Sequence, residues 1–321
     1  MQPIEPTLVS QSLTESRNPR TTWIDRQPTA EVVRLFVQED HAVSKAVEAI
    51  ADDIARAVDL IVAARRAGGR LVYLGAGTSG RLGILDASEL PPTFGVSPDE
   101  AVALIAGGPA AVTQAIEGAE DDEEGARRDL EGIRFAAPDL LVGISASGLT
   151  PYVRAGLALA RERRARTVLL TCNPRGPFPP VDVLLNPVVG PEVITGSTRL
   201  KSGTACKMVL NMLSSVAMIR LGKVYQNLMV DVRATNAKLR DRALRIVVEA
   251  GKVSRERAAE LLTQAGGDTK VAILMARRGG TPELARETLE ATQGVLYRAL
   301  GEPDQPPAGP TASPATGNAQ P

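Results

Sequence analysis

The sequence contains a single histidine among its 321 residues, and this scarcity limits the chemistry it can perform. His41 lies in FVQEDHAVSKAVEAI, a helical stretch with many charged residues, and we expect it to be a solvated surface residue. A histidine-based catalytic triad and a histidine metal cluster are therefore nearly excluded. We expect no metal and no cofactor.

Cysteines and long apolar runs are scarce as well. Cys172 and Cys206 are the only cysteines, too few for a disulfide framework. No apolar stretch approaches the roughly 20 residues of a membrane span, and the first residues, MQPIEPTLVSQSLTESRNP, lack the basic flank and apolar core of a signal peptide. The 37 basic and 37 acidic residues cancel, which argues against a nucleic-acid partner. We expect a cytoplasmic protein with no membrane or nucleic-acid partner.

Hydrophobic side chains make up 44% of the sequence, enough for a sizeable core. Apolar residues at helical spacing over 29–66 predict two helices or one broken helix. Beyond them, five short apolar runs alternate with helical segments, which indicates an α/β fold with a doubly wound, parallel five-stranded sheet flanked by helices. These runs are RLVYLGA (70–76), AVALIAGG (101–108), DLLVGISAS (139–147), RTVLLTCN (166–173) and VDVLLNPVVG (181–190).

The expected domain organisation has four parts. An N-terminal arm covers 1–28, the α/β domain with its flanking helices covers 29–250, and a small helical bundle covers 251–300. The remainder, 301–321, is expected to be a disordered tail, because EPDQPPAGPTASPATGNAQP is rich in Pro, Ala and Gly and has almost nothing to bury.

The turn after the first run, GAGTSG at 75–80, has the GxGxxG spacing of a dinucleotide site. Such a site also needs a carboxylate at the end of the second strand, and Ile105–Gly108 supplies none. The third run ends in a second hydroxyl-rich turn, SASGLT at 145–150. Two such turns at helix N-termini on neighbouring strands can surround one phosphate. Gly, Ser and Thr are also common in ordinary turns and N-caps, and the residues alone leave both interpretations open.

Several long motifs carry a family resemblance. GAGTSGRLGILDASELPPTFG, IAGGPAAVTQAIEGAEDD, SASGLTPYV and PVVGPEVITGSTRLKSGTACKMVLNM together resemble the N-acetylmuramic acid 6-phosphate etherases of the SIS (sugar isomerase) superfamily. The match runs from TESRNPRTTWID at 14–25 to about residue 300. It implies an SIS fold, a homodimer, and a carbon–oxygen lyase that acts in recycling of the bacterial cell wall. In that reaction the lactyl ether of N-acetylmuramate 6-phosphate is cleaved with water, giving N-acetylglucosamine 6-phosphate and D-lactate.

The implied reaction calls for two proton-transferring groups. Direct displacement of an unactivated ether is difficult, but in the open-chain aldehyde the C2 proton is acidic and the lactate at C3 lies β to the carbonyl. Elimination followed by addition of water needs a base for C2 and an acid for the leaving oxygen, and carboxyl groups can serve as either. By resemblance, Glu89 matches the family's proton donor to lactate, and Glu120 matches its second catalytic glutamate, interpreted as the C2 base.

Both glutamates also have a simpler interpretation. Glu89 could be a solvated residue near the end of a helix. Glu120 belongs to an acidic run, and such runs usually form solvated faces. At helical spacing Glu117 shares a face with Glu120 and could contribute nearby.

Hydroxyl groups are the expected phosphate ligands, as related SIS proteins imply: Thr78, Ser79, Ser145, Ser147 and Thr150. Lys201, with Ser197 and Thr198, opens a long helix and could reach the substrate's carboxylate or phosphate; a surface lysine is the equal alternative. Asn236 and Lys238 lie in a strongly matching segment, but no physical reason assigns them a role.

Three other functions compete with the etherase. A sugar-phosphate aldose–ketose isomerase would also use a carboxylate at C2, but such enzymes commonly open the ring with a histidine, and His41 lies in the wrong part of the chain. A related SIS regulator binds fructose phosphates and inhibits glucokinase, yet it has two SIS domains, whereas this sequence has one set of sheet runs. A nicotinamide oxidoreductase lacks its ribose carboxylate.

Overall fold

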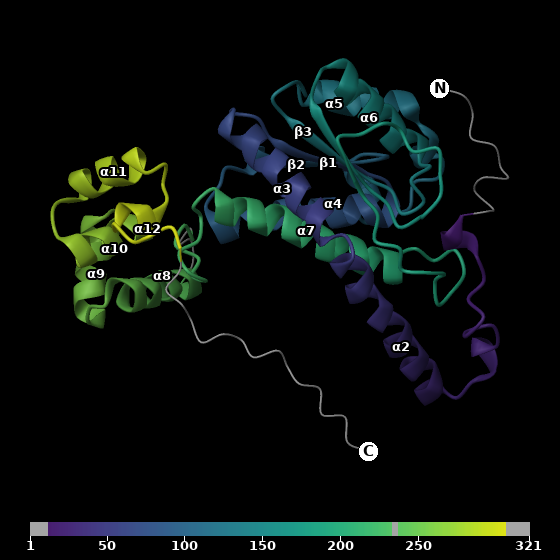
Figure 1. Cartoon of the computed structure of the whole chain (residues 1–321), viewed down its shortest axis with the longest axis horizontal. Helices are drawn as coiled ribbons and strands as arrows, with labels where there is room; N and C mark the ends of the chain where they lie inside the picture. Colours follow the sequence, from purple (N-terminus) through teal and green to yellow (C-terminus); the bar gives the residue numbers. More distant parts are fainter. Residues whose placement is uncertain (1–11, 233–236, 306–321) are drawn as a thin grey trace. The chain divides into compact units, whose positions relative to one another are not determined.

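The computed structural model describes residues 12–232 and 237–305. Its contacts divide the chain into two compact units, Met1–Arg220 and Leu221–Pro321 (Figure 1). The first unit contains the sheet, and the second is built from helices α8 to α12. Within the described ranges, no helix combines the length and the apolar character needed to cross a bilayer.

The sheet of the first unit has five parallel strands in the order β2-β1-β3-β4-β5. This confirms the expected doubly wound α/β fold. All residues of β1 and β3 are buried, because these central strands are covered on both faces. The strands are β1 (Leu71–Gly75), β2 (Ala101–Ile105), β3 (Leu140–Ile144), β4 (Arg166–Leu170) and β5 (Val183–Leu185).

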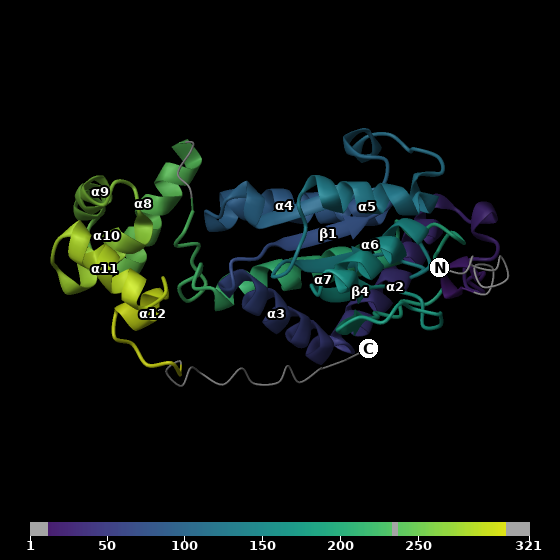
Figure 2. The same ribbon diagram turned by 90° about the horizontal axis from the view of Figure 1, so that it is seen from above.

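Helices lie on both sides of the sheet (Figures 1 and 2). One side carries α5 (Glu123–Gly132) and α6 (Pro151–Glu162), which pack on Val72 and Leu74 of β1. Tyr73, between them in the strand, faces the other side, where its hydroxyl reaches α4. The helices on that side are α3 (Ala51–Arg66), α4 (Gly77–Phe94) and α7 (Lys201–Arg220).

The stretch 29–66 forms two separate helices, which is the first of the two expected arrangements. α2 (Thr29–Glu48) ends before α3 begins at Ala51, and α2 packs against α7. His41 is exposed on α2, which confirms its interpretation as a surface residue. Short 3-10 helices complete the unit: η1 (Leu13–Glu15), η2 (Ile24–Arg26), η3 (Pro98–Glu100), η4 (Pro109–Val112) and η5 (Ala119–Asp121).

The second unit buries its own apolar cluster. Three of its helices begin at a capping side chain that accepts a backbone N–H: Ser254 at 3.2 Å, Asp268 at 3.0 Å and Thr281 at 3.4 Å. The elements are α8 (Ala237–Gly251), α9 (Arg255–Gln264), α10 (Thr269–Arg278), α11 (Pro282–Ala291) and α12 (Leu296–Ala299).

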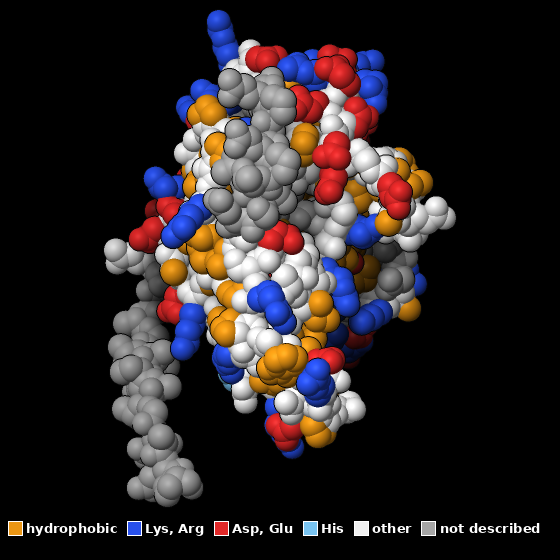
Figure 3. Space-filling model, turned by 90° about the vertical axis from the view of Figure 1, so that its right-hand side faces the viewer, with side chains coloured by type: hydrophobic (Ala, Val, Ile, Leu, Met, Phe, Trp, Pro, Cys, Tyr) orange, Lys and Arg blue, Asp and Glu red, His pale blue; other side chains and the backbone are white. Residues whose placement is uncertain are grey.

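This unit begins at Leu221, earlier than the expected start of the bundle at 251. The difference arises because Ile246 and Val247 of α8 are buried in the same cluster as α10. Of the expected arm, residues 1–11 lie outside the described ranges, as do residues 306–321 of the expected tail. Side chains of both charges are interspersed on the face shown in Figure 3, in keeping with the balanced charge of the sequence.

Candidate active site

The first hydroxyl-rich turn joins β1 to α4 within a few residues. It is tight because a Cβ atom on Gly75 would lie 2.7 Å from the backbone nitrogen of Gly80, and one on Gly80 would lie 2.6 Å from the Ile105 side chain. Gly77, with φ of +52°, begins α4. Thr78 and Ser79 follow in the first helical turn and are half-buried. Among the described residues their hydroxyls have no hydrogen-bond partner, so both are free to bind a ligand.

The second turn, after β3, brings three predicted hydroxyls together. Ser145 Oγ lies 2.8 Å from Thr150 Oγ1 and 3.4 Å from Ser147 Oγ. Two backbone N–H groups hold these hydroxyls in place, since Gly148 N donates to Ser145 Oγ at 3.1 Å and Leu149 N donates to Ser147 Oγ at 3.1 Å. The turn therefore offers a compact set of hydroxyl groups ahead of α6.

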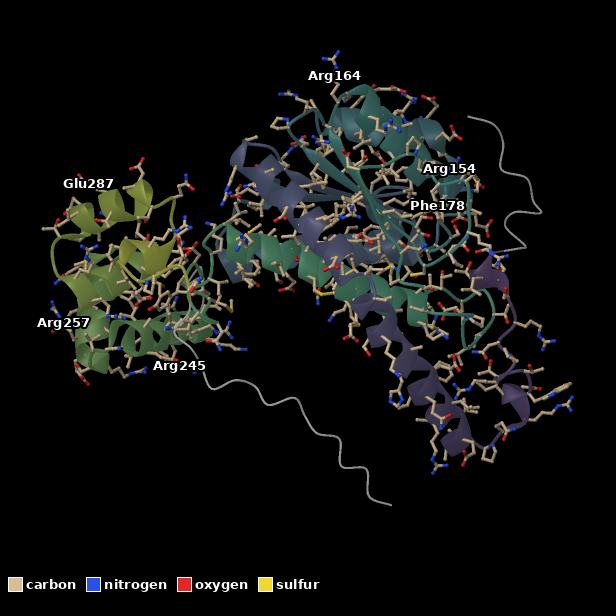
Figure 4. All side chains as sticks on the ribbon, viewed as in Figure 1. Arg154, Arg164, Phe178, Arg245, Arg257 and Glu287 are labelled. Atoms are coloured by element: carbon tan, nitrogen blue, oxygen red, sulfur yellow. The ribbon has the colours of Figure 1, made fainter. Side chains whose placement is uncertain are left out.

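Neighbouring segments hold this second turn in place. Asn173 Nδ2 donates to the Ser147 carbonyl at 3.1 Å. Phe178 packs over Gly148, where a Cβ atom would come within 2.4 Å of the ring. Arg154 fixes the loop before Phe178 through a 2.7 Å bond to the Pro177 carbonyl (Figure 4).

The two turns leave the sheet at adjacent strand ends, because Gly75 of β1 pairs with Ile144 of β3. In the sheet, β2 lies beside β1 on one side of this pair, and β4 lies beside β3 on the other side, so the order of the strands reverses between β1 and β3. Such a reversal at the carboxyl edge is where open α/β sheets bind ligands. The structure thus places the five predicted hydroxyl residues at the edge that favours a ligand.

The N-terminus of α7 flanks the first turn. A Cβ atom on Gly203 would lie 3.7 Å from the Thr78 methyl group. The buried Glu192 carboxylate accepts the N–H groups of Lys201 and Ser202, each at 2.9 Å, and so caps the helix. Ser197 and Thr198 are half-buried just before this cap.

Lys201 is not a surface lysine. It is only 2% exposed, and its Nζ atom lies 2.7 Å from Glu39 of α2. Burial acts to raise the pKa of Glu39, but hydrogen bonds from Lys201 and Asn18 outweigh it and lower that pKa. The ammonium group is therefore engaged in an internal ion pair, and contact between Lys201 and a substrate stays a prediction.

Glu89 lies on α4 well away from the phosphate turns. It is ten residues beyond Ser79, which corresponds to about 15 Å along a helix. Its exposed side chain lines a pocket of about 360 Å3 between α4 and α7, with Asp86, Lys207 and Asn211. Sequence reasoning missed these three neighbours, although Lys207 and Asn211 have the four-residue spacing of one helix face.

Asp86 is the buried acid of this pocket. The Tyr73 hydroxyl donates to it at 2.8 Å and Ser214 Oγ donates at 3.1 Å. Burial raises the pKa of Asp86 to about 6, although hydrogen bonds from Tyr73 and Ser214 act in the opposite direction. The Asn211 amide, turned so that its nitrogen donates to Asp86 Oδ1 at 3.2 Å, accepts from Lys207 Nζ at 3.2 Å.

Glu120 is exposed in η5, which packs against α6 after the carboxyl end of β2. Glu117 does not share a helix face with it. Gly118, with φ of +70°, separates the two residues in a turn, so the helical interpretation of this stretch was wrong. Glu117 instead lines a separate pocket of about 480 Å3 with Gly107 and Arg128. Lys238 is exposed in the second unit, and Asn236 lies outside the described residues.

The chain is similar to several known proteins. Residues 53–161 match the family model described as the glucokinase regulatory protein N-terminal SIS domain, and residues 226–272 match the C-terminal lid domain of the same protein. The N-acetylmuramic acid 6-phosphate etherases of Salmonella dublin and Salmonella typhimurium are each 55% identical to the chain over 295 residues, covering 92% of this chain and 98% of theirs. The solved phosphoheptose isomerase of Neisseria gonorrhoeae is 21% identical, with a TM-score of 0.43, and covers 59% of this chain and 97% of that one.

Proposed function

The chain belongs to the N-acetylmuramic acid 6-phosphate etherase family, and we propose that its two strand-end turns, with Glu89 and Glu120, form the site of that reaction. The protein is a carbon–oxygen lyase that cleaves the D-lactyl ether of N-acetylmuramate 6-phosphate and yields N-acetylglucosamine 6-phosphate and D-lactate. The observation that carries the site is the pairing of two hydroxyl-rich turns at the reversal point of the sheet.

The phosphate group is bound between these turns. Thr78 and Ser79 supply free hydroxyls, and Ser145, Ser147 and Thr150 supply a second set. Hydrogen bonds to a charged phosphate are worth about 1.5 to 3 kcal/mol each. A dinucleotide fits less well, because the chain leaves β2 at Ile105 into Ala106, Gly107 and Gly108 with no carboxylate for a ribose.

Elimination then proceeds in three steps. Glu120 takes the C2 proton of the open-chain sugar, which leaves an enolate. The C3–oxygen bond breaks as Glu89 donates its proton to the departing lactate oxygen, and an α,β-unsaturated aldehyde remains. Water adds at C3 and a proton returns to C2, so both glutamates end in their starting states.

We propose that the site is made from two copies of the chain. Six bonds of about 1.5 Å separate the phosphorus of the substrate from its ether oxygen, which spans at most about 8 Å. Ser79 and Glu89 of one chain lie about 15 Å apart along α4, a distance that the substrate and the two side chains together can cover. The dimer is therefore proposed from the exposed apolar side chains around Glu89, with Glu89 of one copy facing the turns of the other.

Exposed apolar side chains offer a surface for that dimer. Leu85 of α4 is 50% exposed, and Val216 and Ile219 of α7 are 37% and 49% exposed. They lie on the two helices that form the Glu89 pocket. We propose a cytoplasmic location, because Cys172 and Cys206 are both free thiols, as in a reducing compartment.

Two family models that match this chain carry the name of the glucokinase regulatory protein. They match 53–161 and 226–272 only, whereas the etherases match 92% of the chain. An isomerase has no histidine available at the turns, since His41 is exposed on α2.

One assay separates these functions. The purified protein is incubated with N-acetylmuramate 6-phosphate, and D-lactate is measured. The etherase releases lactate in proportion to the phosphosugar consumed. A regulator would release none, and an isomerase would convert the sugar phosphate while keeping the ether intact.

A further inference from the structure

The pocket between α4 and α7 holds a cation that the elimination steps do not use. Lys207 lines it on α7, opposite Glu89 on α4. The Lys207 side chain is exposed, and within the described ranges no carboxylate lies within the 4.0 Å of an ion pair. Its one hydrogen-bond partner is the Asn211 amide oxygen at 3.2 Å.

A chain of buried groups sets the orientation of that partner. Asp86 is 9% exposed and accepts from Tyr73, Ser214 and Asn211. Because Asp86 accepts from the Asn211 nitrogen, the amide must present its oxygen to Lys207. The structure thus holds an exposed ammonium group in the lining of the pocket without a direct ion pair, which is an arrangement suited to an anionic ligand.

We propose that Lys207 binds the carboxylate of the substrate's lactyl group. The inference rests on the proposed function, and it assigns the α4–α7 pocket to the lactyl end of the substrate. A single carbon separates the ether oxygen from that carboxylate, so the group that binds the carboxylate must be a close neighbour of the acid that protonates the oxygen. Lys207 and Glu89 are such neighbours, and Leu85 and Phe94 in the same pocket offer apolar contacts for the lactyl methyl group.

Two consequences follow for the reaction. The ammonium group fixes the ether oxygen beside Glu89, and it stabilises the partial negative charge on that oxygen while the C3–oxygen bond breaks and Glu89 transfers its proton. Lys207 also distinguishes this substrate from a hexosamine 6-phosphate without a lactyl group, because only the ether supplies a carboxylate at that position.

A cycle of two enzymes and two substrates tests the proposal. Wild type and Lys207→Met are assayed for lactate or lactamide release from N-acetylmuramate 6-phosphate and from its lactamide, in which the carboxylate is a neutral amide. We expect the wild type to lose about 10- to 100-fold in kcat/KM on going to the amide, as for loss of one charged hydrogen bond. With the natural acid substrate, Lys207→Met should have a kcat/KM lower than that of wild type by a similar factor. With the lactamide, the kcat/KM of Lys207→Met should be close to that of wild type. Lys45→Met, which changes an exposed lysine of α2, is the matched control and should behave as wild type on both.

The outcomes are distinguishable. If Lys207→Met slows both substrates by the same factor, or neither, the lysine does not bind the carboxylate. A melting temperature equal to that of wild type shows that the exposed residue has been changed without unfolding the chain. If the wild type releases nothing from either substrate, the proposed function fails, and the inference fails with it.

Discussion

At the scale of single residues, the acids of the Glu89 pocket differ sharply in environment. Asp86 is buried and accepts from Tyr73 and Ser214, whereas Glu89, one helical turn later, is exposed. Burial raises the pKa of Asp86 to about 6, from 3.8 for a free side chain. Ionising Asp86 in the folded chain therefore costs free energy. This cost lowers the free energy of unfolding at pH values where Asp86 is ionised.

The pH dependence of unfolding measures that cost. Between pH 3.8 and about 6 the folded chain holds a proton on Asp86 that the unfolded chain has released, so this residue makes stability fall as pH rises through the window. The full contribution is about 3 kcal/mol, from roughly two pH units at 1.36 kcal/mol each. Asp86→Asn removes it, so wild type should lose about 2 kcal/mol relative to the variant between pH 4 and pH 7 in urea unfolding. Asp59→Asn, at an exposed position of α3, is the control; parallel pH curves for wild type and Asp86→Asn would contradict the assignment.

At the scale of elements, the proposed phosphate site lies where two buried strands end. β1 and β3 pair in register to their last residues, and each continues into a turn of glycines and hydroxyls. The glycines of the first turn permit α4 to start directly beside the strand, and the hydroxyls of the second lie within 3.4 Å of Ser145. Neither turn alone is unusual, but their pairing concentrates donors at one edge.

Removing one hydroxyl from each turn tests this pairing. Ser79→Ala and Ser147→Ala should each weaken binding of N-acetylglucosamine 6-phosphate by about one to two decades, since each loses a hydrogen bond to a charged group. Isothermal titration gives the dissociation constants. Ser88→Ala serves as control, because that hydroxyl on α4 bonds only to the Leu85 carbonyl. Unchanged affinity in both turn variants would place the phosphate elsewhere.

The sequence predicted these turns and strands because both depend on local chemistry: apolar runs, glycines and hydroxyls close together in the chain. It could not predict the Glu89 pocket, whose walls come from α4 and α7, more than a hundred residues apart. The burial of Lys201 was hidden for the same reason, since its partner Glu39 lies on α2. The error at Glu117 was local, because Gly118 places a turn within an acidic run that reads as helical.

At the scale of the whole molecule, we propose that two chains share the site. Glu120 and the phosphate turns lie at the carboxyl edge of the sheet, while Glu89 lies about 15 Å along α4 from Ser79. The apolar side chains Leu85, Val216 and Ile219 remain exposed on the helices around Glu89. A symmetric dimer would cover such a surface and create two equivalent sites.

Mixing two inactive variants tests this arrangement. Glu89→Gln and Glu120→Gln homodimers each lack one group in every site. In a mixed dimer with shared sites, one site carries both substitutions and the other carries none. Unfolding and refolding the variants together should therefore restore about a quarter of wild-type lactate release under random pairing. No recovery, with mixed dimers verified by mass spectrometry, would show that both glutamates act within one chain.

The central claim is that the ether is cleaved by elimination, with Glu120 as base and Glu89 as acid. The most direct measurement follows N-acetylmuramate 6-phosphate in D2O by NMR, recording lactate release and deuterium at C2 together. Wild type should release D-lactate and place deuterium at C2 of the product. Glu120→Gln should lose both processes by about 10² to 10⁴, whereas Glu89→Gln should lose lactate release by a similar factor and keep some C2 exchange, because enolate formation does not require a protonated leaving group. A wild-type product that retains its C2 proton, or exchange that survives in Glu120→Gln and disappears in Glu89→Gln, would contradict the account.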